Sequence, residues 1–124
     1  MIAADSSSIV AYLAGESAED VDQVAAAVDA ETLVLPPAVI TEILSDAKSS
    51  ADVESFIDGL PLLAPKKGYW QRAGLARRLV KKHGKRALLG DALIAQTCID
   101  HDVALITRDE DFRHFAKHCG LRLV

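Results

Sequence analysis

The chain has 124 residues and a mass of 13.3 kDa, enough for one domain with its own hydrophobic core. Half of its residues are hydrophobic and 26 % are charged, which excludes a disordered, collagen-like or coiled-coil protein. No apolar stretch is long enough to span a membrane, and the first residues do not resemble a signal peptide. The two cysteines are too few to staple a domain of this size, so we expect a cytoplasmic protein with reduced thiols.

The formal net charge of −4 conceals two regions of opposite sign. Residues 1–58 carry twelve acidic residues and one lysine, whereas residues 59–90 carry nine basic residues and no acidic one. Residues 91–124 contribute a net charge of −2. A basic block of this kind can be a solvated helix face, a partner-binding surface or a phosphate-binding strip, so the mild average does not exclude a nucleic-acid partner.

Hydrophobic periodicity, capping residues and turn signals predict strands alternating with helices. The predicted elements, in chain order, are a strand at 1–4, a helix ending at Gly15, an amphipathic helix from Ser17 to Ala30, a strand at 32–35, helices at 38–48 and 51–58, a strand at 60–64, helices at 67–83 and about 90–100, a strand at 103–107, a helix at 109–118 and a strand at 121–124. This order indicates a single α/β domain over residues 1–124. We expect three layers, with a mainly parallel central sheet of four to five strands flanked by helices.

Four acidic residues occupy positions where such a domain binds ligands. Asp5 and Asp109 follow predicted strands, and ligands of parallel sheets bind beyond the carboxyl ends of the strands. Asp91 opens a nearly all-apolar helix, and Glu42 stands among apolar residues of another helix, so part of it should face inward. Singly, the aspartates could be helix N-caps and Glu42 an ordinary exposed residue.

Taken together, these acids favour a metal site. Carboxylates at the edge of buried elements are costly unless they are paired or bind a metal, and Arg108 is the nearest basic candidate in sequence. Several clustered carboxylates form a hard, all-oxygen site that suits Mg²⁺ or Mn²⁺. Such a site is typical of phosphodiester hydrolysis, because the metal lowers the pKa of a bound water and neutralises charge on the phosphate.

The same residues carry a family resemblance. The chain resembles a PIN-domain ribonuclease, and in particular the toxin of VapBC-type toxin–antitoxin modules. The matching pieces, in order, are Asp5-Ser6-Ser7 after the opening strand, the Pro-Pro-Ala-Val-Ile-Thr-Glu run ending at Glu42, Gly90-Asp91-Ala92 and Thr107-Arg108-Asp109-Glu110-Asp111. One mild departure is the pair Pro36-Pro37, where a single proline is more usual.

This resemblance implies an endoribonuclease that depends on Mg²⁺ or Mn²⁺. Its catalytic and metal-binding acids would be Asp5, Glu42, Asp91 and Asp109. Supporting roles would fall to Ser6, Ser7, Thr107 and Asp111, the last being more structural than catalytic. The resemblance also implies cleavage of cellular RNA, possibly tRNA, a homodimer, and a cognate VapB-like antitoxin whose tail lies over the active site.

The basic block would then counter the repulsion between the acids and an RNA backbone. The candidate backbone contacts are Arg72, Arg78, Lys81, Lys82, Arg86 and Arg108. Tyr69 and Trp70 could stack on a base but are interpreted as core or dimer contacts. With few exposed aromatic residues expected, recognition should depend on RNA shape and loop context.

Three alternatives remain open at this point. A phosphatase or receiver-like domain could use Asp5 as phospho-acceptor, although no suitable lysine follows a late strand. A non-catalytic nucleic-acid-binding module would use its acids only as helix caps. The spacing of His114, His118 and Cys119 could hold zinc, but a polar helix end is the preferred interpretation.

Overall fold

The computed structural model describes all 124 residues. Its elements, in chain order, are β1 (Ile2–Ala4), α1 (Ser6–Leu13), α2 (Glu19–Asp29), β2 (Leu33–Val34), α3 (Pro37–Leu44), α4 (Ala51–Asp58), α5 (Tyr69–Lys82), α6 (Leu89–His101), β3 (Ala104–Ile106) and α7 (Phe112–Cys119). The alternation of strands and helices that the sequence predicts is therefore confirmed. None of the helices combines the length and the hydrophobicity needed to cross a bilayer.

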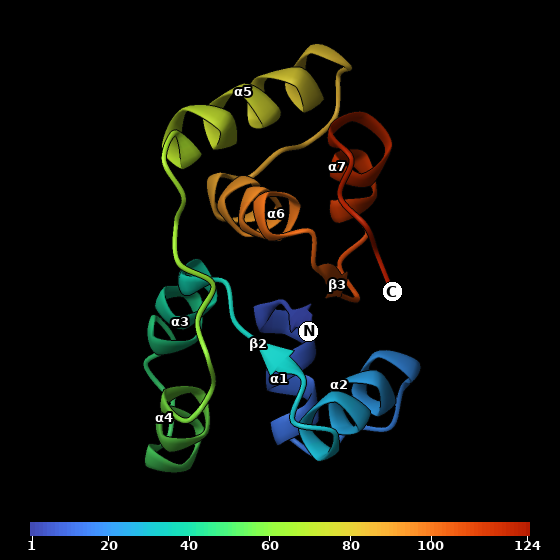
Figure 1. Ribbon diagram of the computed structural model, residues 1–124. Coiled ribbons are helices and arrows are strands. Elements are labelled where there is room, and N and C mark those ends of the chain that lie inside the picture. The colour runs from blue at the N-terminus through green and yellow to red at the C-terminus, as the bar shows by residue number, and fades with distance from the viewer.

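The three strands form a parallel sheet in the order β2-β1-β3. The chain moves from β1 to β2 through α1 and α2, and then crosses β1 to reach β3 through α3, α4, α5 and α6, with α7 following β3. Because parallel crossovers are right-handed, opposite directions of travel put the helices on opposite faces. Figure 1 shows α1 and α2 below the strands and α5, α6 and α7 above them.

The expectation of four to five strands is wrong, because the sheet has only three. Residues 60–64 and 121–124 each contribute one isolated parallel bridge, Leu35 with Leu62 and Leu105 with Leu123. Leu62 lies between two prolines, Pro61 and Pro65, which have no backbone N–H to donate to a ladder. The outer segments therefore touch the sheet edges without extending them as strands.

A single hydrophobic core joins the sheet to the helices on both faces. Its largest fully buried side chains include Phe112, Phe115, Ile9, Ile94 and Leu105, which come from helices on both faces and from β3. As its apolar sequence predicts, α6 is buried over most of its length, including nearly every residue from Ala92 to Cys98. This burial matters for function, because α6 carries Asp91 into the interior.

The start of α2 differs from the prediction. The helix begins at Glu19 with Ala18 as N-cap, which provides no side-chain hydrogen bond, so Ser17 is not its cap. Asp20, in the first turn of α2, accepts a hydrogen bond from the Ser8 hydroxyl and pairs with Arg108. Its side chain therefore makes tertiary contacts with α1 and with the segment after β3.

Candidate active site

The candidate site lies at the carboxyl ends of β1 and β3. The connection after β1 leads toward β2, whereas the chain after β3 leads to the opposite edge of the sheet, where Leu123 bridges Leu105. In parallel sheets, this reversal of direction opens a crevice between the two strands, which is where ligands bind. Asp5 directly follows β1, and the segment Thr107–Asp109 follows β3, so both reach this crevice.

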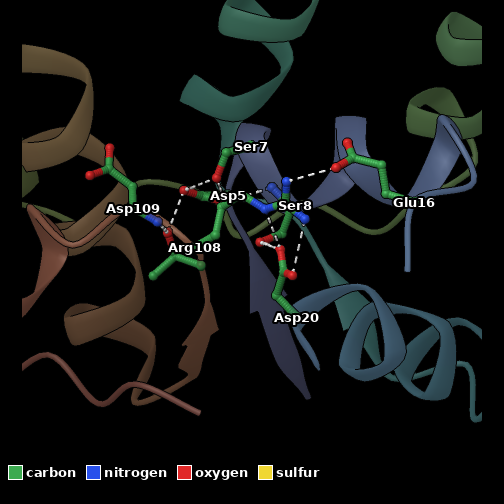
Figure 2. A network of polar contacts seen from close by, with 8 residues as sticks. Asp5, Ser7, Ser8, Glu16, Asp20, Arg108 and Asp109 are labelled. Atoms are coloured by element: carbon green, nitrogen blue, oxygen red, sulfur yellow. Dashed lines mark hydrogen bonds and ion pairs between the residues drawn. The ribbon is translucent and has the colours of Figure 1, made fainter. Parts of the chain in front are cut away.

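The Asp5 carboxylate is held by four hydrogen bonds. Its Oδ1 accepts a hydrogen bond from the backbone N–H of Ser8 at 3.1 Å. Asp5 is therefore the N-cap of α1, one of the two roles that the sequence allowed for it. The Ser7 hydroxyl lies 2.9 and 3.0 Å from its two oxygens (Figure 2). The Thr107 hydroxyl donates to Oδ2 at 2.6 Å. Burial raises the pKa of Asp5, while the hydrogen bonds from Thr107, Ser8 and Ser7 oppose this effect.

Thr107 also orients Asp109. The backbone N–H of Asp109 donates to the Thr107 hydroxyl at 3.0 Å, so this one hydroxyl joins the acid after β1 to the segment after β3. Asp109 Oδ1 in turn accepts from the backbone N–H of Asp111 at 2.9 Å, which turns the chain into α7. The other oxygen of Asp109 has no such local partner.

Asp91 is the acidic residue of the site whose negative charge is least favourable. It lies in the first turn of α6 and does not cap the helix, whose N-cap position is Leu88. It is 6 % exposed, and its Oδ2 is buried without any hydrogen-bond partner. Burial, followed by the negative charges of Asp109 and Glu42, raises the pKa of Asp91 to about 7. A buried carboxylate oxygen with no protein partner indicates that the missing partner is a ligand, and a cation fits the surrounding charge.

Glu42 approaches the same place from α3. The residue is exposed as a whole, so the expectation of an inward-facing side chain is only partly met, but Ser6 donates a 2.6 Å hydrogen bond to its Oε1. Its Oε2 packs against the start of α6, where a Cβ added to Gly90 would lie 3.0 Å away. Gly90 therefore provides room for the carboxylate beside Asp91.

The structure brings Asp91, Asp109 and Asp111 together. One ligand oxygen from each of the three lies within 4.8 Å of the others, as a divalent cation would require. Asp5 and Glu42 stand outside this set of three but act on Asp91 through their charges. Sequence reasoning gave Asp111 only a supporting role, although its spacing two residues after Asp109 was a signal that both could face one ion.

Arg108 points away from these carboxylates. Its guanidinium pairs with Asp20, with Nε to Oδ2 at 2.8 Å, and with Glu16 at 3.2 Å (Figure 2). Asp20 also accepts a hydrogen bond from the hydroxyl of Ser8, whose backbone N–H donates to the Asp5 carboxylate. The acidic stretch of residues 16–31 therefore includes two residues, Glu16 and Asp20, that hold the segment bearing Asp109. Arg108, the basic residue nearest to the acids in sequence, therefore does not pair with the acid cluster. Its guanidinium is engaged by Glu16 and Asp20 and is not free to contact RNA.

The other basic candidates divide into two groups. Arg72 forms a bidentate ion pair with Asp100, at 2.9 and 2.6 Å, and Arg86 lies 3.6 Å from Asp111. The remaining candidates lie in an open groove along α5. This groove is lined by Gly74, Arg77, Arg78, Lys81, Lys82 and Leu89. Only this second group is free to meet an anionic ligand.

The zinc interpretation finds no support. The carboxylate set is the only group of three metal-ligating side chains in the structure. His118 instead stacks on His83, with ring centroids 3.8 Å apart. Both cysteines are free, and burial raises the pKa of Cys98 to about 12, as expected for an inert core residue.

The comparisons with known proteins agree on the family and the fold. A family model described as PIN domain matches residues 2–118. The structure of VapBC2 from Rickettsia felis bound to a DNA fragment from its promoter is similar, with a TM-score of 0.75 and 19 % identity over 100 % of this chain and 98 % of that one.

Two further solved structures show the same fold. FitAcB from Neisseria gonorrhoeae matches with a TM-score of 0.69 and 19 % identity, covering 99 % of this chain and 96 % of that one. FitAB bound to an IR36 DNA fragment matches with a TM-score of 0.66 and 16 % identity, covering 100 % and 94 %. No curated protein matches the sequence. Since the family model extends over nearly the whole sequence, the chain belongs to the PIN domain family.

Proposed function

We propose that the chain is an endoribonuclease that depends on Mg²⁺ or Mn²⁺. The observation that carries the proposal is the buried, unpartnered Oδ2 of Asp91 among converging carboxylates. Without a cation, this arrangement places several negative charges together, and the Oδ2 of Asp91 has no hydrogen bond to offset its burial. PIN domains are typically nucleases, which agrees with this chemistry.

The proposed ligands are Asp5, Glu42, Asp91 and Asp109, with Asp111 added by its position beside Asp91 and Asp109. A bound cation would supply an activated water and charge neutralisation at the scissile phosphate. The chain itself contributes orientation, because Thr107 and Ser7 hold the Asp5 carboxylate and Ser6 holds that of Glu42. Hydroxyl donors that fix the acids before a metal arrives raise its affinity.

We further propose that the chain is the toxin of a type II toxin–antitoxin pair acting in the cytoplasm. Support comes from the fold neighbours, which are named VapBC2 and FitAB and were determined with DNA. The proposed partners are RNA, with tRNA as the candidate substrate, a VapB-like antitoxin and a second copy of the chain. The phospho-acceptor alternative gains nothing from the site, since Arg108, its nearest cation, is paired with Asp20 and Glu16.

The test is RNA cleavage by the purified protein together with calorimetric titration of Mn²⁺. We expect cleavage that EDTA stops and Mn²⁺ restores, and loss of both cleavage and Mn²⁺ binding in Asp5→Asn and Asp91→Asn. The exposed Asp22 on α2 offers a matched control, and Asp22→Asn should behave as wild type. Full cleavage in either active-site variant, or failure of the wild type to bind Mn²⁺, would contradict the proposal. Sequencing RNA ends after induced expression, with Asp5→Asn as reference, would then identify the substrate.

A further inference from the structure

An apolar pocket of about 310 Å³ opens directly beside the acid cluster, at the small end of the range for ligand pockets. It lies between the start of α3, the start of α5 and the start of α6. Its lining includes Pro37, Glu42, Pro65, Trp70, Leu89 and Gly90. Glu42 is therefore both a wall of this pocket and a neighbour of Asp91, so a ligand in the pocket lies next to the site of chemistry.

Trp70 gives the pocket a flat aromatic wall. Trp70 is 66 % exposed, so of the expected core or dimer contact only the core contact is excluded, and Leu89, which also lines the pocket, is 61 % exposed. The ring of Tyr69 meets the indole edge to face, with centroids 4.9 Å apart. Tyr69 is buried and donates a 2.7 Å hydrogen bond to the carbonyl of Leu93, which anchors this contact. Two large apolar side chains left in solvent around a hollow indicate a binding surface.

The basic groove on α5 continues from this pocket, because Leu89 lines both. Arg77, Arg78, Lys81 and Lys82 provide its positive charge, and α5 carries no acidic residue. Gly74 also lines this groove, and a Cβ added there would have no atom within 4 Å, so the groove is open at this position. The carboxylate centre, the apolar pocket and the cationic groove of α5 therefore lie side by side, with the pocket adjoining both of the others.

We propose that the pocket binds one unpaired nucleobase of the RNA, stacked on Trp70, while the backbone follows the cationic groove of α5. This inference rests on the proposed function for the identity of the substrate and adds the form in which it is recognised. A base within a duplex has both faces covered, so only single-stranded loops or ends can enter. Stacking on an aromatic ring accepts every base, which predicts weak sequence preference.

A second copy of the chain fits this surface less well. Symmetric dimers pair the same patch on both subunits, so a contact through this face would bring two cationic α5 grooves together. An RNA strand instead brings phosphates to the cations and a flat ring to the indole. The charge of the surface therefore favours the nucleic acid.

The test uses Trp70 itself, which is the only tryptophan of the chain. A short labelled oligoadenylate is titrated in EDTA, with fluorescence anisotropy reporting binding and indole emission reporting stacking. We expect quenching of the indole by oligoadenylate, and none by its duplex with oligouridylate or by an abasic ribose-phosphate oligomer. Trp70→Ala should weaken oligoadenylate binding by about 5- to 100-fold, and Trp70→Phe by less. The matched control is Leu79→Ala, which removes another exposed apolar side chain of α5 outside the pocket and should leave binding unchanged.

Binding without quenching, or unchanged affinity in Trp70→Ala, would overturn the inference. A second result would also overturn the inference. If sedimentation shows that Trp70→Ala changes the protein from dimer to monomer, and this variant binds oligoadenylate as tightly as a wild-type monomer does, the pocket is an interface between copies of the chain. These outcomes differ from failure of the proposed nuclease. Quenching by oligoadenylate without any cleavage would retain the base pocket and refute the enzyme, whereas metal-dependent cleavage unaffected by Trp70→Ala would do the reverse.

Discussion

Replacing Asp91 by asparagine in the metal-free protein should make the fold more stable at pH 8. The carboxylate is buried, its Oδ2 has no partner, and neighbouring acids repel it. Asparagine is nearly the same size and removes the charge, and its amide can donate to the neighbouring carboxylates. The variant that should abolish catalysis is thus expected to stabilise the metal-free chain.

The size of the effect follows from the pKa of Asp91. Its rise from 3.8 to about 7 corresponds to at most about 4 kcal/mol, and water near the half-buried Asp109 and Asp111 should reduce this to about 1–3 kcal/mol. The folded state holds the proton more tightly than the unfolded one. The contribution of Asp91 to the free energy of unfolding of the wild type is therefore most favourable below pH 4, and this contribution is lost as the pH rises toward 7. The advantage of Asp91→Asn should be complete above pH 7 and vanish near pH 4.

The assay is urea unfolding in EDTA at pH 8 and pH 5, repeated with saturating Mn²⁺ at pH 8. Mn²⁺ at about 100 times its dissociation constant should stabilise the wild type by about 2.7 kcal/mol and the variant much less. Asp100→Asn on the same helix is the control of opposite sign, because the ion pair with Arg72 lowers the pKa of Asp100. If Asp91→Asn destabilises the metal-free protein equally at both pH values, the electrostatic argument is wrong.

Four further substitutions test individual parts of the structure. Thr107→Val breaks the hydroxyl bridge between two acids and should weaken Mn²⁺ binding about 10-fold or more by calorimetry, while Thr107→Ser retains it. Gly90→Ala places a methyl group about 3.0 Å from Glu42 Oε2, so Mn²⁺ affinity should fall with little loss of thermal stability. Arg108→Gln should lower stability slightly in urea unfolding at low salt, a difference that high salt removes. Lys81→Gln should reduce the salt slope of RNA binding by about 1, and Arg108→Gln should leave this slope unchanged.

The cationic groove and the acidic cluster would together allow a chain with net charge −4 to bind RNA, as we propose. The acids that dominate the first half of the sequence are distributed over α2, α3, α4 and the connecting loops. Two of them, Glu16 and Asp20, share the single positive charge of Arg108. The charges that would face a substrate are the cations of α5 and carboxylates that a metal would neutralise.

Much of the fold and part of the site follow from the sequence alone. Apolar runs and their punctuation specify the order of strands and helices, since each element must bury one face and cap its ends. The positions of Asp5 and Asp109 after strands placed them at one edge of a parallel sheet, because parallel strands end on the same side. The apolar sequence of α6 likewise predicted the burial of Asp91.

Only the tertiary structure decided which side chains pair. Arg108 could have faced the acid cluster or Asp20, and nothing local distinguishes partners 88 residues apart. The recruitment of Asp111, the exposure of Trp70 and the loss of two predicted strands likewise depend on how distant segments pack. Periodicity determines which face of an element is apolar, whereas the contacts of a polar or aromatic side chain depend on what the rest of the chain places beside it.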